Sequence, residues 1–149
     1  MIIHNFNPIL VDLGVLQIRW YSLAYIFGIV IGWAYANKII RLNRKNKYNY
    51  AQITTRHFDD LIVYLVIGIV LGGRMGYVIF YNLEYFTHNF LEIFQIWQGG
   101  MSFHGGLLGV IISILIYSKK TNTNFYIFAD IVSCVAPIGI FFGRIANFI

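Results

Sequence analysis

Four apolar runs, each about 20 residues long, divide this chain of 149 residues. The runs cover residues 20–40, 61–81, 97–117 and 125–148, and about 20 residues is the length a helix needs to cross a bilayer. Charged residues make up only 11% of the chain and the mean hydropathy is +0.67, whereas a soluble domain is about a quarter charged. The sequence therefore predicts an all-α, polytopic membrane helix bundle of about four transmembrane helices, in a single membrane domain over residues 1–149.

The basic residues predict how this bundle is oriented. The net charge is +5, and six of the eleven cations lie in one short segment: Lys38, Arg41, Arg44, Lys45, Lys47 and Arg56. Residues 1–18 contain neither Lys nor Arg and would form a short lead-in. Because cytoplasmic loops carry the excess of cations, we expect segment 38–56 to be cytoplasmic and the N-terminus to be extracytoplasmic. Nucleic-acid binding explains this clustering less well.

The third apolar run begins with the glycine-rich sequence GGMSFHGGLLG at residues 99–109. Glycines loosen a helix, and irregular backbone inside a membrane persists only where protein buries it or water fills a cavity. We therefore expect an irregular, glycine-rich start to the third helix. Ser102 and His104 would lie within the membrane, with His104 on the wall of a polar cavity.

Each run also carries small residues four positions apart, a spacing that permits close helix contact where lipid supplies no hydrophobic drive for association. The glycines concerned are Gly28/Gly32, Gly68/Gly72/Gly76, Gly105/Gly109 and Gly139/Gly143. A tightly packed bundle is therefore expected.

Helical rise places the unusual polar residues at similar depths. At about 1.5 Å per residue, Tyr21 lies at the outer interface, Arg74 and His104 lie about 10 Å below it, and Arg144 and Asn147 about 2 to 6 Å below it. Ionisable residues inside a membrane span are costly and are functional candidates by default. We expect these groups to converge in the outer half of the bilayer.

Structural explanations compete with that interpretation. Arg74 could pair with a carboxylate or a carbonyl and hold the bundle together, Arg144 could extend to the interface, and His104 could be a hydrogen-bonded core residue. Tyr21 and Tyr77 fit an interfacial or packing role better than a catalytic one.

Two buried cations and an imidazole suit one kind of chemistry. Cationic side chains in a dry cavity can hold a phosphate diester, which guanidinium binds in a bidentate manner, and an imidazole can take a proton from an incoming nucleophile. A phospholipid is the anionic substrate expected at that depth. No Cys, His, Asp and Glu residues show metal-ligand spacing, and the single cysteine, Cys134, rules out an internal disulfide.

Four blocks of the sequence resemble the prolipoprotein diacylglyceryl transferases of bacterial inner membranes. They are Trp20-Tyr21, GGRMGYVIFYN at 72–82, the 99–109 stretch and GRIANFI at 143–149, with matching spacing between them. The resemblance implies transfer of a diacylglyceryl group from phosphatidylglycerol to the lipobox cysteine thiol of a preprolipoprotein. The thiolate would displace glycerol phosphate and leave a thioether, with no metal or soluble cofactor.

The resemblance also implies roles for particular residues. Arg144 would bind the phosphatidylglycerol head group, and His104 would be the base for the thiol, or would instead order the lipid phosphate. The same cavity would be lined by Tyr21, Arg74, Tyr77 and Asn147.

The family signature continues beyond Asn-Phe-Ile, whereas this chain ends at Ile149. We therefore expect the N-terminal half of such a transferase, with four of about seven spans. The chain would be a fragment, a subunit that depends on a C-terminal half polypeptide, or an inactive remnant. The competing hypothesis is a non-catalytic phospholipid-binding or assembly subunit of a membrane complex; a transporter is a weaker third.

Overall fold

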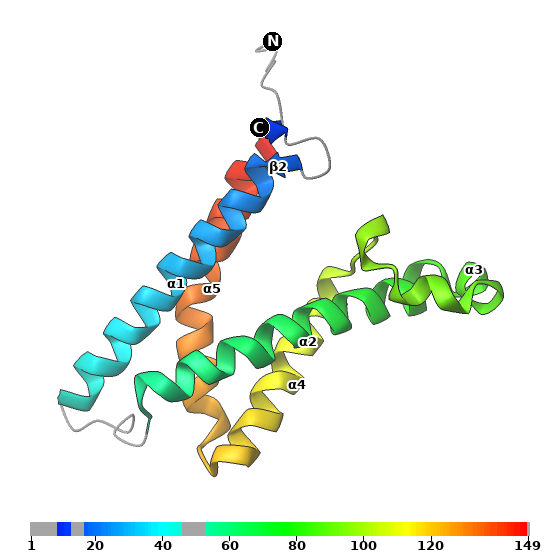
Figure 1. Cartoon of the computed structure of the whole chain (residues 1–149). Helices are drawn as coiled ribbons and strands as arrows, with labels where there is room; N and C mark the ends of the chain where they lie inside the picture. The colour runs from blue at the N-terminus through cyan, green and yellow to red at the C-terminus, as the bar shows by residue number, and fades with distance from the viewer. Residues whose placement is uncertain (1–8, 13–16, 46–52, 149) are drawn as a thin grey trace. The chain divides into compact units, whose positions relative to one another are not determined.

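The computed structural model describes residues 9–12, 17–45 and 53–148, and four long helices make up most of this part of the chain (Figure 1). They are α1 (Trp20–Lys45), α2 (Thr55–Tyr81), α4 (Phe103–Thr121) and α5 (Phe125–Phe148). The predicted all-α architecture is therefore confirmed. Helices α1 and α2 extend beyond the apolar runs only at their charged ends, residues 41–45 and 55–60.

The third long helix begins later than the apolar run. The chain from α2 passes through α3 (Leu83–His88) and two short 3-10 helices, η2 (Phe90–Phe94) and η3 (Ile96–Gln98). Gly99 and Gly100 then have φ values of 83° and 81°, a region that favours glycine and ends helical geometry. Ser102 caps α4, and its side chain accepts a hydrogen bond from the Gly105 N–H at 3.3 Å. The irregular glycine-rich start is confirmed, although the helix starts at Phe103.

A small antiparallel hairpin precedes α1. Strand β1 (Ile9–Asp12) pairs with β2 (Gln17–Arg19), with Val11 opposite Ile18 and a register shift between Ile9 and Val11. Sequence analysis predicted only a lead-in here, because the segment shows neither a strong alternation nor an apolar run.

The chain divides into two compact units. Residues 51–129 form the first, which we call the α2/α4 unit, and residues 1–50 and 130–149 form the second, the α1/α5 unit. That residues 1–149 form a single membrane domain stays a prediction.

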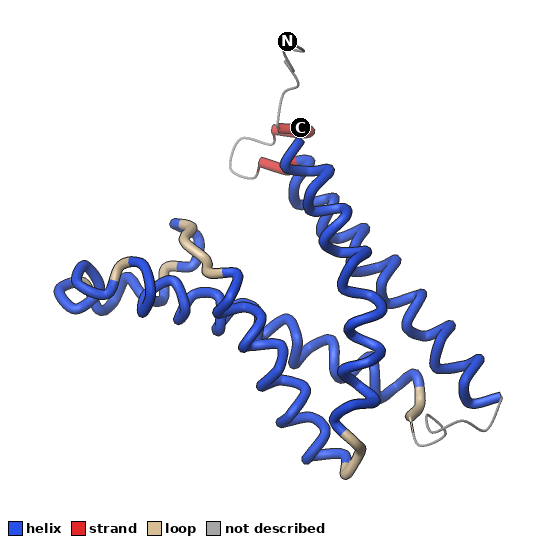
Figure 2. The backbone as a smooth tube through the Cα atoms, turned by 180° about the vertical axis from the view of Figure 1, so that it is seen from behind, coloured by secondary structure: helices blue, strands red, loops and turns tan. Residues whose placement is uncertain are grey.

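Glycines bring α2 and α4 together along an antiparallel seam (Figures 1 and 2). A Cβ added to Gly76 would lie 2.7 Å from the Cα of Gly105, and one added to Gly72 would lie 3.0 Å from the Cα of Gly109. Such separations leave no room for a side chain. Ser113 adds a hydrogen bond across the seam, donating to the Tyr64 carbonyl at 2.8 Å. The close contact predicted from glycine spacing is confirmed for these two helices.

Helices α1 and α5 also run antiparallel, with looser packing. A Cβ added to Gly28 would lie 3.2 Å from the Cα of Gly139, and one added to Gly32 would lie 3.7 Å from the Cβ of Val135. A Cβ added to Gly139 would meet nothing within 4 Å. Among the glycines whose surroundings the structure describes, the closest approach between the two helices is that of Gly28 to Gly139.

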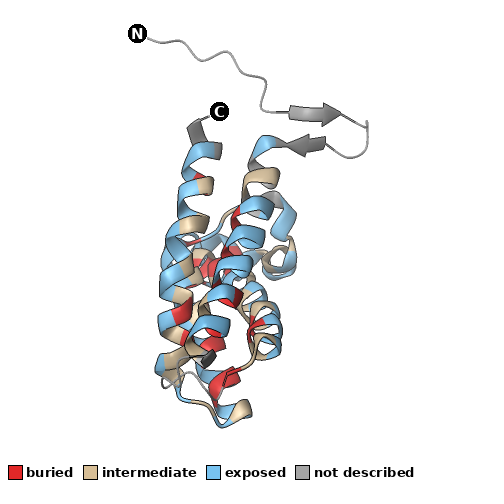
Figure 3. Cartoon of the chain, turned by 90° about the vertical axis from the view of Figure 1, so that its left-hand side faces the viewer, coloured by how far each residue is buried: buried red, intermediate tan, exposed pale blue. Residues whose placement is uncertain are grey.

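Large apolar side chains cover much of the helix surface, and buried residues form only narrow strips (Figure 3). So many exposed apolar side chains are unfavourable in water but are favourable in the hydrocarbon interior of a membrane. Within the described residues, two helices, Thr55–Tyr81 and Phe125–Ile145, are long and apolar enough to cross a membrane. The structure is thus a helical bundle of membrane type, and spans at α1 and α4 stay predictions.

Candidate functional site

Arg74 lies on α2 with only 4% of its surface exposed, and its guanidinium is bonded to backbone carbonyls. Nε donates to the Ile93 carbonyl at 2.9 Å and one terminal nitrogen, Nη2, donates to that of Glu92 at 2.6 Å. The other, Nη1, donates to the carbonyls of Gly99 and Gly100, at 2.5 and 3.3 Å. A buried charge needs such partners, because burial without them is very costly. Arg74 therefore joins two separate segments of the α2–α4 connection.

The chain leading into α4 is fixed by two further contacts. The Ser102 N–H donates to the Gly73 carbonyl at 2.8 Å, directly beside Arg74 on α2. Gly100 packs against the ring of Tyr77, where an added Cβ would lie 2.7 Å from the ring atom Cζ. Only glycine fits at this position, because both its φ and the neighbouring ring exclude a side chain.

Aromatic rings surround the guanidinium. Its Cζ atom lies 5.2 Å from the ring centroid of Phe86 and 5.9 Å from that of Tyr77, within the range of a cation–π interaction. Tyr77 stacks on Tyr81 with 5.9 Å between centroids, and its hydroxyl accepts a hydrogen bond from the Asn82 amide at 2.8 Å. Tyr77 thus makes both packing and polar contacts, which agrees with the packing role considered for it in the sequence analysis.

His104 is the second residue of α4, in the same unit as Arg74. Its side chain is exposed, and its ring meets the ring of Phe103 edge-on at 5.8 Å. Within the part of the chain that the structure describes, the imidazole has no hydrogen-bond partner. The ring is therefore exposed within this unit, and the choice between a functional and a structural role for His104 stays a prediction.

The other three predicted site residues belong to the α1/α5 unit. Arg144 is an exposed residue of α5. Tyr21 lies in the first turn of α1 and Asn147 in the last turn of α5, but their side chains are outside the described residues. Because the two helices are antiparallel, these backbone positions lie at the same end of the unit (Figure 1). That all six predicted residues line one cavity stays a prediction.

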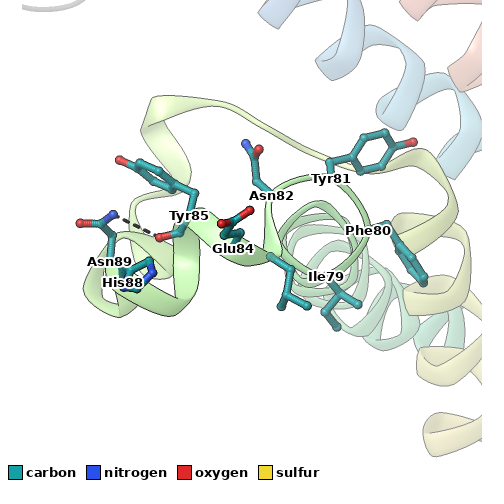
Figure 4. A pocket seen from close by; sticks show the side chains of 9 residues that line it. Ile79, Phe80, Tyr81, Asn82, Glu84, Tyr85, His88 and Asn89 are labelled. Atoms are coloured by element: carbon teal, nitrogen blue, oxygen red, sulfur yellow. Dashed lines mark hydrogen bonds between the residues drawn. The ribbon is translucent and has the colours of Figure 1, made fainter.

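A separate open pocket lies where α2 passes into α3 (Figure 4). Its lining includes Asn82, Tyr85 and His88 and excludes Arg74 and His104. The Tyr85 hydroxyl donates to a Glu92 carboxylate oxygen at 2.6 Å, and this bond raises the pKa of Tyr85 above its ordinary value. Within the described residues, no group of three His, Cys, Asp or Glu side chains could hold a metal ion.

Sequence analysis missed several parts of this site. Ser102 was named only for its membrane depth, and Phe86 and the carbonyls of Glu92 and Ile93 were not considered. The two positive-φ glycines, Gly99 and Gly100, signal a turn. A backbone carbonyl, by contrast, has no signature in the sequence, because every residue carries one.

Comparison with known proteins identifies the family. The sequence model of the prolipoprotein diacylglyceryl transferases matches residues 8–149. Proteins named phosphatidylglycerol–prolipoprotein diacylglyceryl transferase are similar to the chain in Rickettsia canadensis (strain McKiel), with 48% identity over 149 residues, and in Rickettsia typhi, with 49% over 150 residues. Both matches cover 100% of this chain and 55% of the relative.

The protein of that name from Nitrobacter hamburgensis is 46% identical over 144 residues, which are 97% of this chain and 49% of the relative. The chain thus spans about half the length of the curated relatives it matches. Because the family match extends through both units, from the hairpin to the end of α5, this chain belongs to the prolipoprotein diacylglyceryl transferase family.

Proposed function

We propose that this chain takes part in transferring a diacylglyceryl group from phosphatidylglycerol to the lipobox cysteine thiol of a prolipoprotein. The observation that supports this most is the free imidazole of His104, at the start of a helix whose entry is fixed by Arg74 and Gly73. The family supplies the substrates: its members' names contain phosphatidylglycerol and prolipoprotein.

The reaction requires a nucleophile and a leaving group. His104 takes the thiol proton, and the thiolate attacks the glyceryl carbon that bears the phosphate ester. A C–S bond forms, the C–O bond breaks, and glycerol phosphate leaves with the bonding electrons. Arg144 binds the phosphate, since guanidinium pairs with phosphate oxygens in a bidentate manner. The cavity walls are completed by Tyr21, Arg74, Tyr77 and Asn147.

The proposed setting is the bacterial inner membrane, with several spans and an extracytoplasmic N-terminus. The supporting observations are the apolar surfaces of α2 and α5 and the concentration of cations in segment 38–56. In this orientation the ends of α1 and α5 that carry Tyr21 and Arg144 face the outer leaflet, where the lipid substrate is available. A C-terminal half polypeptide is the proposed partner.

A direct assay tests this function. The chain is reconstituted with phosphatidylglycerol and a lipobox peptide, alone and together with the C-terminal half of a relative, and the peptide is analysed by mass spectrometry. We expect a thioether-linked diacylglyceryl product with the C-terminal half present. His104→Gln should abolish the product, and Arg144→Lys should raise the KM for phosphatidylglycerol. Lys119→Gln, which changes an exposed cation at the other end of α4, is the matched control.

A second candidate is a non-catalytic phospholipid-binding or assembly subunit, which the exposed Arg144 and the exposed apolar helix surfaces also suit. Binding of phosphatidylglycerol without product in either arrangement would support this candidate and refute the transferase proposal. Neither binding nor product would indicate an inactive remnant.

A further inference from the structure

The hydrogen bonds of Arg74 leave little capacity for a ligand. A guanidinium has five N–H groups, and four of them donate to the carbonyls of Glu92, Ile93, Gly99 and Gly100. A lipid phosphate recognised by a guanidinium fork needs two parallel N–H donors. Arg74 has only one N–H to offer, so bidentate binding of phosphate would break at least one of its backbone bonds.

We propose that Arg74 is a positioning residue that sets the place of His104 through the backbone and does not contact the lipid phosphate. The proposal rests on the proposed function for the role of His104. It assigns to Arg74 a task different from that of Arg144, although both are arginines on apolar helices.

The path from Arg74 to His104 is short and continuous. Arg74 holds the carbonyls of Gly99 and Gly100, and two residues later the Ser102 N–H bonds to the Gly73 carbonyl on α2. Ser102 then caps α4, and His104 follows two residues further on. Because reacting groups must be held within a fraction of an ångström, a loosened turn would misplace the imidazole while leaving its chemistry unchanged.

Arginine is required at this position because of its shape. A lysine ammonium carries three donors on a single nitrogen, whereas the guanidinium spreads its donors over a planar fork. Arg74→Lys would keep the charge and would hold at most part of the connection. We therefore expect Arg74→Lys to lose some of the hydrogen bonds to the connection and Arg74→Met to lose all of them.

The first measurement is amide hydrogen exchange of the full chain in lipid nanodiscs. The Gly99 N–H bonds to Ile96 and the Ser102 N–H bonds to Gly73, so both amides are protected in the wild type. We expect about tenfold faster exchange of these amides in Arg74→Met and a smaller increase in Arg74→Lys. Amides of α4 beyond Gly109 should be unchanged, which shows that the helix pair is folded. Arg56→Met, which changes an exposed arginine on the same helix, is the control.

The second measurement is the steady-state kinetics of product formation, in the arrangement that proves active. A positioning residue lowers kcat and leaves the KM for phosphatidylglycerol nearly unchanged, whereas a head-group ligand raises KM. We expect Arg74→Lys to lower kcat about tenfold or more with a KM within about threefold of the wild type. Arg144→Lys should instead raise the KM for phosphatidylglycerol and leave kcat nearly unchanged.

Two results would overturn the positioning role. One is unchanged exchange at Gly99 and Ser102 in Arg74→Met. The other is a raised KM with unchanged kcat in Arg74→Lys, which would place the guanidinium on the lipid. If the wild type forms no product in any arrangement, the proposed function fails, and the exchange data by themselves decide whether Arg74 holds the turn.

Discussion

The two helix pairs of this protein have the same glycine spacing and different packing. In the α2/α4 unit, glycines of both helices meet backbone to backbone, and an added Cβ on Gly72, Gly76 or Gly109 would collide with main-chain atoms. In the α1/α5 unit, Gly28 approaches Gly139, yet a Cβ on Gly139 would meet open space. Glycine spacing therefore permits close contact, and complementary glycines on the facing helix decide whether it forms.

The difference corresponds to what each pair carries. The tight seam ends next to Gly73 and Arg74, which hold the entry to α4 and hence His104. The looser pair carries Arg144, which is exposed on α5. In the proposed function, the closely packed pair would position the base, and the exposed Arg144 would bind the lipid head group.

The largest effect should come from a methyl group added to the tight seam. In Gly109→Ala the new Cβ would collide with the Gly68 carbonyl, so the helices must separate. Overpacking of this kind lowers the free energy of unfolding by about 3 kcal/mol, measurable by denaturant titration in mixed micelles. Gly139→Ala is the matched control and should stay within about 0.5 kcal/mol of the wild type. Equal losses in both variants would contradict the difference between the pairs.

A smaller effect is expected where Gly28 approaches Gly139 in the other pair. In Gly28→Ala the new methyl group would lie 3.2 Å from the Cα of Gly139, a contact that a shift of a few tenths of an ångström relieves. We expect a loss of about 1 kcal/mol in the same titration, the low end for overpacking. A loss as large as that of Gly109→Ala would show that α1 and α5 pack as tightly as α2 and α4.

The smallest effect should come from the hydrogen bond across the seam. Ser113→Ala removes the donor to the Tyr64 carbonyl, and bonds of this type between membrane helices contribute about 0.6 kcal/mol. Ser133→Ala, which changes an exposed serine of α5, should have no measurable effect. If both serine variants unfold at the same denaturant concentration, the seam does not depend on this bond.

Sequence patterns predicted the long helices well and their connections poorly. The bounds of α5 match its apolar run, and those of α1 and α2 differ only at their charged ends. Hydropathy records where an apolar run ends, whereas a helix can continue into polar residues. The apolar run begins at Trp97, but α4 begins only at Phe103, because Gly99 and Gly100 turn the chain in between.

The role of Arg74 illustrates the same limit. Its pairing with carbonyls was among the expected alternatives, but the carbonyls that it binds belong to the connection between α2 and α4 and not to another long helix. Which carbonyls lie within reach depends on the path of residues 82–102, and the contacts along that path include those of Phe86 and Gly100 with the Tyr77 ring. Patterns of residue type do not contain this information.

The proposed function requires that His104 and Arg144 act on the same phospholipid. Phosphatidylglycerol with a photoreactive head group, cross-linked to the reconstituted chain and mapped by mass spectrometry, tests this claim directly. The proposed function predicts that head-group adducts occur both at residues 99–106 and at residues 141–148, and that Arg144→Lys reduces both. Adducts confined to one of these segments, or absent from both, would contradict it.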